Sequence, residues 1–156
     1  MNIFKKLVLS AAAIIMAASM LTGCSSGDSV NNTSHSSMYY VKNADLFSDC
    51  PDVSLEQVMN KYLENPFWTS SGSDDMINVS GVLKGIGENL SVTVKITKGS
   101  DPQSNSFSVT GAAINDSPAP TVEDAELLLS WMFQAYRDGY ETFADFTAAN
   151  PLDSLN

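Results

Sequence analysis

Few side chains in this sequence could carry out covalent catalysis. The chain of 156 residues contains a single histidine, His35, and two cysteines, Cys24 and Cys50. Nucleophilic catalysis needs a general base positioned beside the nucleophile. Because His35 lies in a polar segment ahead of the first predicted element, we expect no Ser-His or Cys-His pair inside the folded domain. The sequence therefore predicts no catalytic residue and no cofactor.

Acidic residues offer the remaining route to acid–base or metal chemistry. Asp74 and Asp75 are adjacent, and Asp45, Asp49 and Asp52 form a loose cluster. Neighbouring residues of a strand or loop usually point apart, and the cluster lacks the D-x-D-x-D-G pattern of a calcium loop. A zinc site needs several Cys or His ligands, which one domain cysteine cannot supply. The sequence favours solvated charges in both places and predicts no metal site.

One apolar pair could mark a contact surface. Leu127 and Trp131 are spaced i, i+4 and fall off the main apolar stripe of the helix predicted around them. Their neighbours are polar: Asp124, Ser130, Asp138 and Glu141. An aromatic side chain on a polar face can indicate a partner site. Two interpretations stay open: the pair contacts a partner, or it packs against Phe67-Trp68 or a neighbouring loop.

The N-terminal segment has the pattern of a secretory signal. Lys5 and Lys6 precede an apolar run over residues 7–21 that is broken only by Ser10 and Ser19. A helix that spans a bilayer needs about 20 apolar residues, and this run is shorter. A basic flank before a short apolar run is typical of a signal peptide. A retained transmembrane anchor is the alternative.

The sequence that follows the apolar run is Leu21-Thr22-Gly23-Cys24. It resembles the lipobox of bacterial lipoproteins. The resemblance implies that residues 1–23 are a signal peptide, that cleavage occurs before Cys24, and that a diacylglycerol is attached to the Cys24 thiol. Two or more acyl chains bind a membrane stably, whereas one chain binds only marginally. We therefore expect a protein that is lipid-anchored at the extracytoplasmic face of the cell membrane. Residues 24–37, which begin with the acylated cysteine, are expected to form a polar tether between the lipid and the domain.

The mature chain would be strongly acidic. Loss of Lys5 and Lys6 leaves 6 of the 8 basic residues and all 18 acidic ones, so the net charge changes from −10 to −12. Such a chain is repelled by nucleic acid and by anionic headgroups. We expect contact with the membrane through the lipid only. With Cys24 acylated, Cys50 is a free or intermolecularly paired thiol, or a small buried apolar side chain.

One domain is predicted over residues 38–149, with a tail at 150–156. Residues 38–41 have the composition of a short strand. Ser54 and Gln57 form a capping box at the start of a helix, which Asn65-Pro66 is expected to end. Alternating patterns at 77–83, 90–97 and 107–114 predict three strands of an antiparallel meander. Residues 85–89 are predicted to be the turn between the first two of these strands rather than a phosphate-binding loop.

A long helix is predicted after the strands. Thr121 has the character of its N-cap, and an apolar stripe continues from Ala125 to Phe146, with a candidate soft point at Gly139. The predicted fold class is α+β: an N-terminal helix, a three-stranded antiparallel meander and a long C-terminal helix, with both helices on one face of the sheet.

The domain also resembles small uncharacterised bacterial lipoproteins. The residues that carry this resemblance are the capped helix, Asn65-Pro66-Phe67-Trp68 and a V-x-x-G-like strand at 77–81. The resemblance implies no activity. The sequence favours a non-enzymatic binding module whose partner is an envelope protein or another envelope component. The alternatives are a passive assembly subunit of an envelope complex and a carboxylate-dependent hydrolase.

Overall fold

The computed structural model describes residues 37–70 and 75–150. The predicted signal peptide, Cys24 and most of the predicted tether and tail lie outside these residues, as do His35 and Asp74. No helix within the described residues is both long and apolar enough to cross a bilayer.

The described strands form an antiparallel sheet in the order β1-β2-β3-β4-β5, each paired with its neighbour in the chain. The strands are β1 (Leu63–Ser70), β2 (Met76–Leu83), β3 (Asn89–Thr97), β4 (Ser106–Ile114) and β5 (Ser117–Pro118). A short 3₁₀ turn, η1 (Pro102–Ser104), lies between β3 and β4. The α+β class is thus correct, but the prediction of three strands is wrong because β1 and β5 extend the meander at its two edges.

Strand β1 was not predicted from the sequence because it contains the Asn65-Pro66 dipeptide, which had been expected only to end a helix. Helix α3 (Leu55–Tyr62) begins at the predicted capping box, with Ser54 Oγ accepting from the Gln57 amide. It stops before the proline, and the chain passes directly into β1. Asn65 has a φ of 48°, and the register of β1 on β2 shifts between Glu64 and Phe67. Proline is tolerated on edge strands and at bulges, and β1 provides both.

Strand β5 follows a two-residue turn that had not been predicted. Asn115 and Asp116 have φ values of 49° and 63°, as a type I′ hairpin requires. The turn is tied to the start of β3 because the Asn89 amide donates to Asn115 Oδ1 over 2.9 Å. The Asn115 amide in turn donates to the Asn89 carbonyl over 2.8 Å.

Residues 38–41 are helical and not extended. They belong to α2 (Ser37–Lys42), which begins at a residue that had been assigned to the tether. Val41 is fully buried, and Met38 and Tyr40 pack against the core. The spacing of Met38 and Val41 by three residues places both on one side of the helix, so tertiary packing overrides the β propensity of the Tyr-Tyr-Val run.

The predicted C-terminal helix is two helices, α4 (Val122–Arg137) and α5 (Phe143–Ala149). Gly139 has a φ of 82°, its amide donates to the Tyr136 carbonyl, and the Tyr140 amide donates to the Ala135 carbonyl. These two bonds are those of a Schellman ending with glycine at C′. A second capping box then starts α5, with Thr142 as its N-cap.

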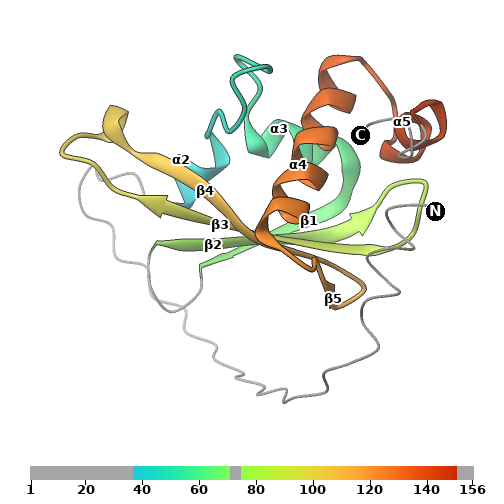
Figure 1. Cartoon of the computed structure of the whole chain (residues 1–156), viewed down its shortest axis with the longest axis horizontal. Coiled ribbons are helices and arrows are strands. Elements are labelled where there is room, and N and C mark those ends of the chain that lie inside the picture. The colour runs from blue at the N-terminus through green and yellow to red at the C-terminus, as the bar shows by residue number, and fades with distance from the viewer. Residues whose placement is uncertain (1–36, 71–74, 151–156) are drawn as a thin grey trace.

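The described residues therefore contain four α-helices instead of two. Figure 1 shows α2, α3 and α4 on one side of the sheet, with α5 at the end of this layer. The core lies between the helices and the sheet, and alternate side chains of β2 and β3 point into it. In β3 these are Leu90, Val92, Val94 and Ile96, all almost fully buried. No described helix or strand covers the opposite face of the sheet (Figure 1).

Candidate functional site: the uncovered face of the sheet

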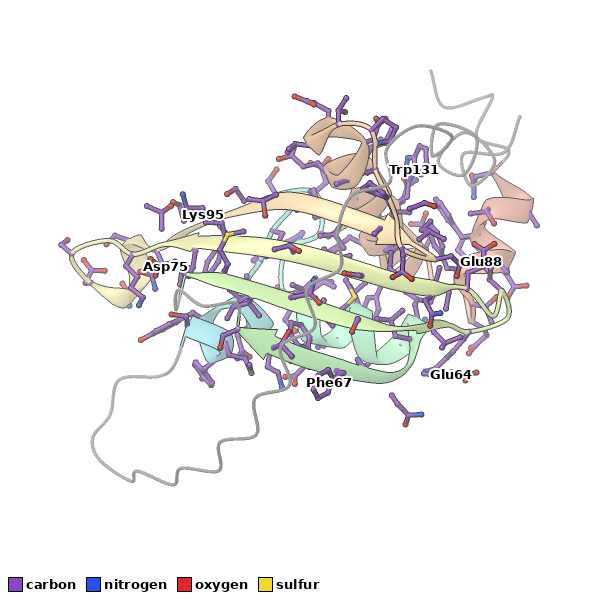
Figure 2. The ribbon with its side chains drawn as sticks, turned by 90° about the horizontal axis from the view of Figure 1, so that it is seen from below. Glu64, Phe67, Asp75, Glu88, Lys95 and Trp131 are labelled. Carbon is purple, nitrogen blue, oxygen red and sulfur yellow. The ribbon has the colours of Figure 1, made fainter. Side chains whose placement is uncertain are left out.

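The uncovered face of the sheet presents small polar side chains. In β3, Ser91 and Thr93 are half-buried and Lys95 is exposed, and they alternate with the buried residues of the same strand. Asn78 and Ser80 of β2 lie opposite Thr93 and Ser91. A sheet face without a covering layer is expected to carry such residues. Figure 2 shows this side of the molecule, and we call it the open face.

One row of paired residues crosses the open face from the β1 edge to β4. Phe67 of β1 pairs with Ser80, Ser80 with Ser91, and Ser91 with Ala113 of β4. Directly opposed side chains in an antiparallel sheet lie about 4.5–5.5 Å apart, so the row is continuous. Phe67 is 66% exposed, more than any other large apolar side chain in the described residues. The row thus joins a bare phenyl ring to two hydroxyl groups.

The bulge in β1 determines which side chains reach this face. Glu64 pairs with Val82 and Phe67 with Ser80, so three steps along β1 match two steps along β2. In a regular strand, residues three apart point to opposite faces. The extra residue restores them to the same face, where Figure 2 shows Glu64 and Phe67 along the β1 edge. The bulge therefore places a carboxylate on the same face of the sheet as the exposed ring.

A shallow groove of about 450 Å³ runs over this part of the open face. Its lining comes from β1, β2, β3, β4 and the β4–β5 turn: Glu64, Asn65, Phe67, Ser80, Gly81, Val82, Asn89, Leu90, Ser91, Ala113 and Asp116. The volume is within the usual range of ligand sites, about 300–1,000 Å³. The lining includes two carboxylates, Glu64 and Asp116, and no Lys, Arg or His.

The floor of the groove is partly fixed by hydrogen bonds. Asn78 Nδ2 donates to Ser91 Oγ over 2.9 Å and to Thr93 Oγ1 over 3.1 Å. The Ser80 hydroxyl makes no hydrogen bond to another described residue. Groups held in place before a ligand arrives lose less entropy on binding. The floor of the groove therefore has one hydroxyl, of Ser91, that is held by a hydrogen bond from Asn78, and one, of Ser80, that is available to a ligand.

The two residues of the predicted contact pair, Leu127 and Trp131, differ in exposure. Leu127 is 41% exposed, whereas Trp131 is 6% exposed and belongs to the core. The expectation of an exposed aromatic is therefore wrong for Trp131, which is buried in the core. The buried arc of α4 runs from Trp131 to Phe133, roughly 200° at 100° per residue. It is wider than the predicted stripe, and at its Phe133 end Phe47, from the loop before α3, packs edge-on against Phe133 with ring centroids 5.0 Å apart.

Cys50 is a buried thiol that makes no disulfide. Burial raises its pKa, and this effect outweighs the opposing charge of Arg137. The Arg137 guanidinium lies close by, with Nη1 donating to the Asp49 carbonyl over 3.4 Å. A thiolate is needed for nucleophilic reactivity, so the geometry favours the interpretation of Cys50 as a small apolar side chain.

The acidic candidates are surface charges where the structure describes them. Asp75 lies 3.5 Å from Lys98 Nζ in an exposed ion pair, while its sequence neighbour Asp74 is outside the described residues. Asp45, Asp49 and Asp52 are exposed. Within residues 37–70 and 75–150, no group of three His, Cys, Asp or Glu residues is arranged to hold a metal ion.

Comparison with known proteins suggests no function for the open face. The chain matches no protein-family model, no curated protein and no solved structure. The sequence pattern had favoured a meander with one polar face, because the predicted strands alternate and both predicted helices lie on one side. It did not identify the groove, because β1 and the β4–β5 turn, which carry Glu64, Phe67 and Asp116, were not predicted. The signals that could have indicated them were the aromatic pair Phe67-Trp68 beside a proline, and Asn115-Asp116 as a hairpin turn.

Proposed function

We propose that this protein is a lipid-anchored, non-enzymatic binding module of the bacterial envelope, and that the open face is its binding surface. The lipid is carried by Cys24, and the domain stands on the extracytoplasmic side of the cell membrane. The basis for the anchor is the resemblance of Leu21-Thr22-Gly23-Cys24 to a lipobox. The basis for the binding surface is the geometry of the sheet.

The exposed ring of Phe67 is the single observation that carries the proposal. At 66% exposure, most of its apolar surface is in water, at a cost of about 25 cal/mol for each Å². Its neighbour Trp68 points to the other face, where Lys42 of α2 covers its ring at 5.2 Å from the centroid. Lys42 thus covers the ring of Trp68, whereas the ring of Phe67 is exposed to solvent at the groove. Aromatic anchors of this kind are enriched at binding hot spots.

The net charge of the mature chain supports contact with the membrane through the lipid alone. A net charge of −12 on the mature chain, counted as above from 6 basic and 18 acidic residues, disfavours anionic headgroups and nucleic acid. The domain therefore touches the bilayer through its lipid, and its partner is an envelope protein or another envelope component.

In-cell crosslinking tests the binding surface. A photo-reactive amino acid at position 80, in the middle of the open face, is compared with the same group at position 127 on α4. We expect a crosslinked partner from position 80 that disappears when Phe67→Ala is added and persists with Leu127→Ala. A partner seen only from position 127, or one unaffected by Phe67→Ala, would support assembly through another face instead.

Metabolic labelling with a fatty acid tests the anchor. We expect label on the wild type, and loss of both label and membrane association in Cys24→Ala. Equal membrane association of the two proteins, with label on neither, would contradict a lipid anchor and favour a spanning segment.

A further inference from the structure

The groove on the open face has a definite electrostatic character. Its two ionisable side chains, Glu64 and Asp116, are both acidic, and neither makes an ion pair with another described residue. We propose that the groove binds an extended basic peptide segment of an envelope partner. This inference rests on the proposed function and specifies the chemistry of its partner.

Apart from Lys95, the basic side chains of the described residues contact groups that lie outside the groove. Lys42 pairs with Glu56 at 2.9 Å, Lys98 with Asp75 at 3.5 Å and Arg137 with Asp138 at 3.0 Å. Lys84 donates to the carbonyls of Asn60 and Lys61, and Lys61 lies over the rings of Tyr62 and Tyr136. Figure 2 shows Lys95 beside Asp75, at the end of the open face opposite to Glu64. The acidic groove is therefore left for a cation from another molecule.

The two carboxylates are held at opposite sides of the groove. Glu64 pairs with Val82, Val82 with Asn89, and Asn89 is hydrogen-bonded to Asn115, the neighbour of Asp116. These are three steps between adjacent chains, so the carboxylate-bearing backbones are about 14 Å apart at about 4.8 Å a step. An extended peptide advances about 3.3 Å per residue and points residues i and i+4 to the same side. Two basic side chains four residues apart therefore match the pair.

The groove between the carboxylates suits the rest of such a peptide. The exposed ring of Phe67 can hold a Lys or Arg head by a cation–π contact and cover its methylene stem. The Ser80 hydroxyl and the Asn89 side chain can exchange hydrogen bonds with a peptide backbone, which offers both donors and acceptors. A simple polyamine offers donors only and is the less suitable occupant.

Charge disfavours the occupants that this chain itself could supply. Residues 25–36 contain Asp28 and no Lys or Arg, and residues 151–156 contain Asp153 and no Lys or Arg. A second copy of the mature chain has a net charge of −12, as counted above. Like charges repel across an interface, so the partner is a different, basic molecule.

Calorimetric titration of the full-length lipidated protein in uncharged detergent tests the inference. The probe is the synthetic peptide TSKVTVKST, and its matched control is TSEVTVEST. We expect binding of the first peptide only, with an affinity that falls as salt is raised because exposed ion pairs are screened.

Variants locate the site. Glu64→Gln and Asp116→Asn should each weaken binding by up to about five-fold, the upper range for one exposed ion pair. The double variant should weaken it by about ten-fold or more, and Phe67→Ala should weaken it as well. Glu126→Gln and Leu127→Ala, at exposed positions of α4, should leave it unchanged.

The inference would be overturned by no binding of the lysine peptide, by equal binding of the glutamate peptide, or by unchanged binding to the double variant. Tighter binding of spermine than of the peptide would also overturn it, by assigning the groove to small polycations. None of these results alters the crosslinking from position 80. Failure of the basic-peptide inference is therefore distinguishable from failure of the open face as a binding surface.

Discussion

The two faces of the sheet are built from the same strands and differ in almost every physical property. On the covered face, Leu90, Val92, Val94 and Ile96 of β3 are removed from water. On the open face, Ser91, Thr93 and Lys95 of the same strand remain in contact with it. A period of two residues thus separates the side chains that stabilise the fold from those available to a partner. Substitutions on the two faces should consequently have separable effects.

The largest effect is expected from the covered face. Phe133 of α4 is fully buried and packs edge-on against Phe47. Phe133→Ala should lower the free energy of unfolding by about 3–5 kcal/mol, through lost burial and the cavity that remains. Chemical denaturation followed by circular dichroism measures this. Ser80→Ala, on the open face, removes a hydroxyl that makes no hydrogen bond to another described residue and should change the same quantity by less than about 0.5 kcal/mol. Similar losses in the two variants would remove the distinction between the faces.

Two glycines allow a matched comparison of backbone effects. A Cβ at either Gly139 or Gly111 would meet no atom within 4 Å, but only Gly139 has a positive φ, at 82°. Gly139→Ala should destabilise the fold by about 1–2 kcal/mol, the cost of a left-handed backbone for an L-residue. Gly111→Ala, in β4, should be neutral or stabilising by up to about 1 kcal/mol, since alanine restricts the unfolded chain. Thermal unfolding of both variants should show a lower melting temperature for Gly139→Ala only, and equal shifts would argue against the Schellman ending of α4.

A buried tyrosine on the covered face should make stability depend on pH in alkali. Burial raises the pKa of Tyr62 above its ordinary value of 10, and its hydroxyl donates to the Tyr140 carbonyl over 3.1 Å. The folded state favours the neutral phenol, so its contribution is complete below pH 10 and declines as the pH rises further. Tyr62→Phe should lose about 0.5–1.5 kcal/mol at pH 7 and show a flatter decline above pH 10. Parallel curves for the two proteins would contradict this assignment.

The smallest effect on stability is expected at the exposed ring. Phe67→Ala should alter the free energy of unfolding by less than about 0.5 kcal/mol, because little of the ring is buried. The same change should abolish the crosslink from position 80. A large loss of stability in Phe67→Ala would instead make this ring part of the core.

Local signals in the sequence predicted where helices begin better than where they end, and they placed both ends of β2, β3 and β4 to within one residue. The capping box at Ser54 and the alternation in β2, β3 and β4 were correct because these are short-range patterns with a direct structural cause. The end of α4 was missed although Gly139 and the Thr142-x-x-Asp145 box both indicate it. The apolar stripe continues in register through Gly139, and that continuity concealed the break.

The candidate site was less accessible to prediction because it depends on pairing between distant segments. The groove exists only once β1 pairs with β2 and brings Glu64 and Phe67 to the open face, and β1 begins with a bulge that disrupts its alternation. The burial of Trp131 depends likewise on how elements pack around α4, which a helical projection does not contain. Periodicity finds the apolar stripe of a helix, but tertiary packing sets how wide the buried arc becomes.

Oxidative footprinting with hydroxyl radicals tests the open face most directly. It compares the labelling of Phe67, which is 66% exposed, with that of Leu127, which is 41% exposed, in the purified protein and in intact cells. We predict that both side chains are oxidised in the purified protein, and that in cells Phe67 alone becomes protected relative to Leu127. An unchanged ratio of the two in cells would contradict the assignment of the open face as the binding surface.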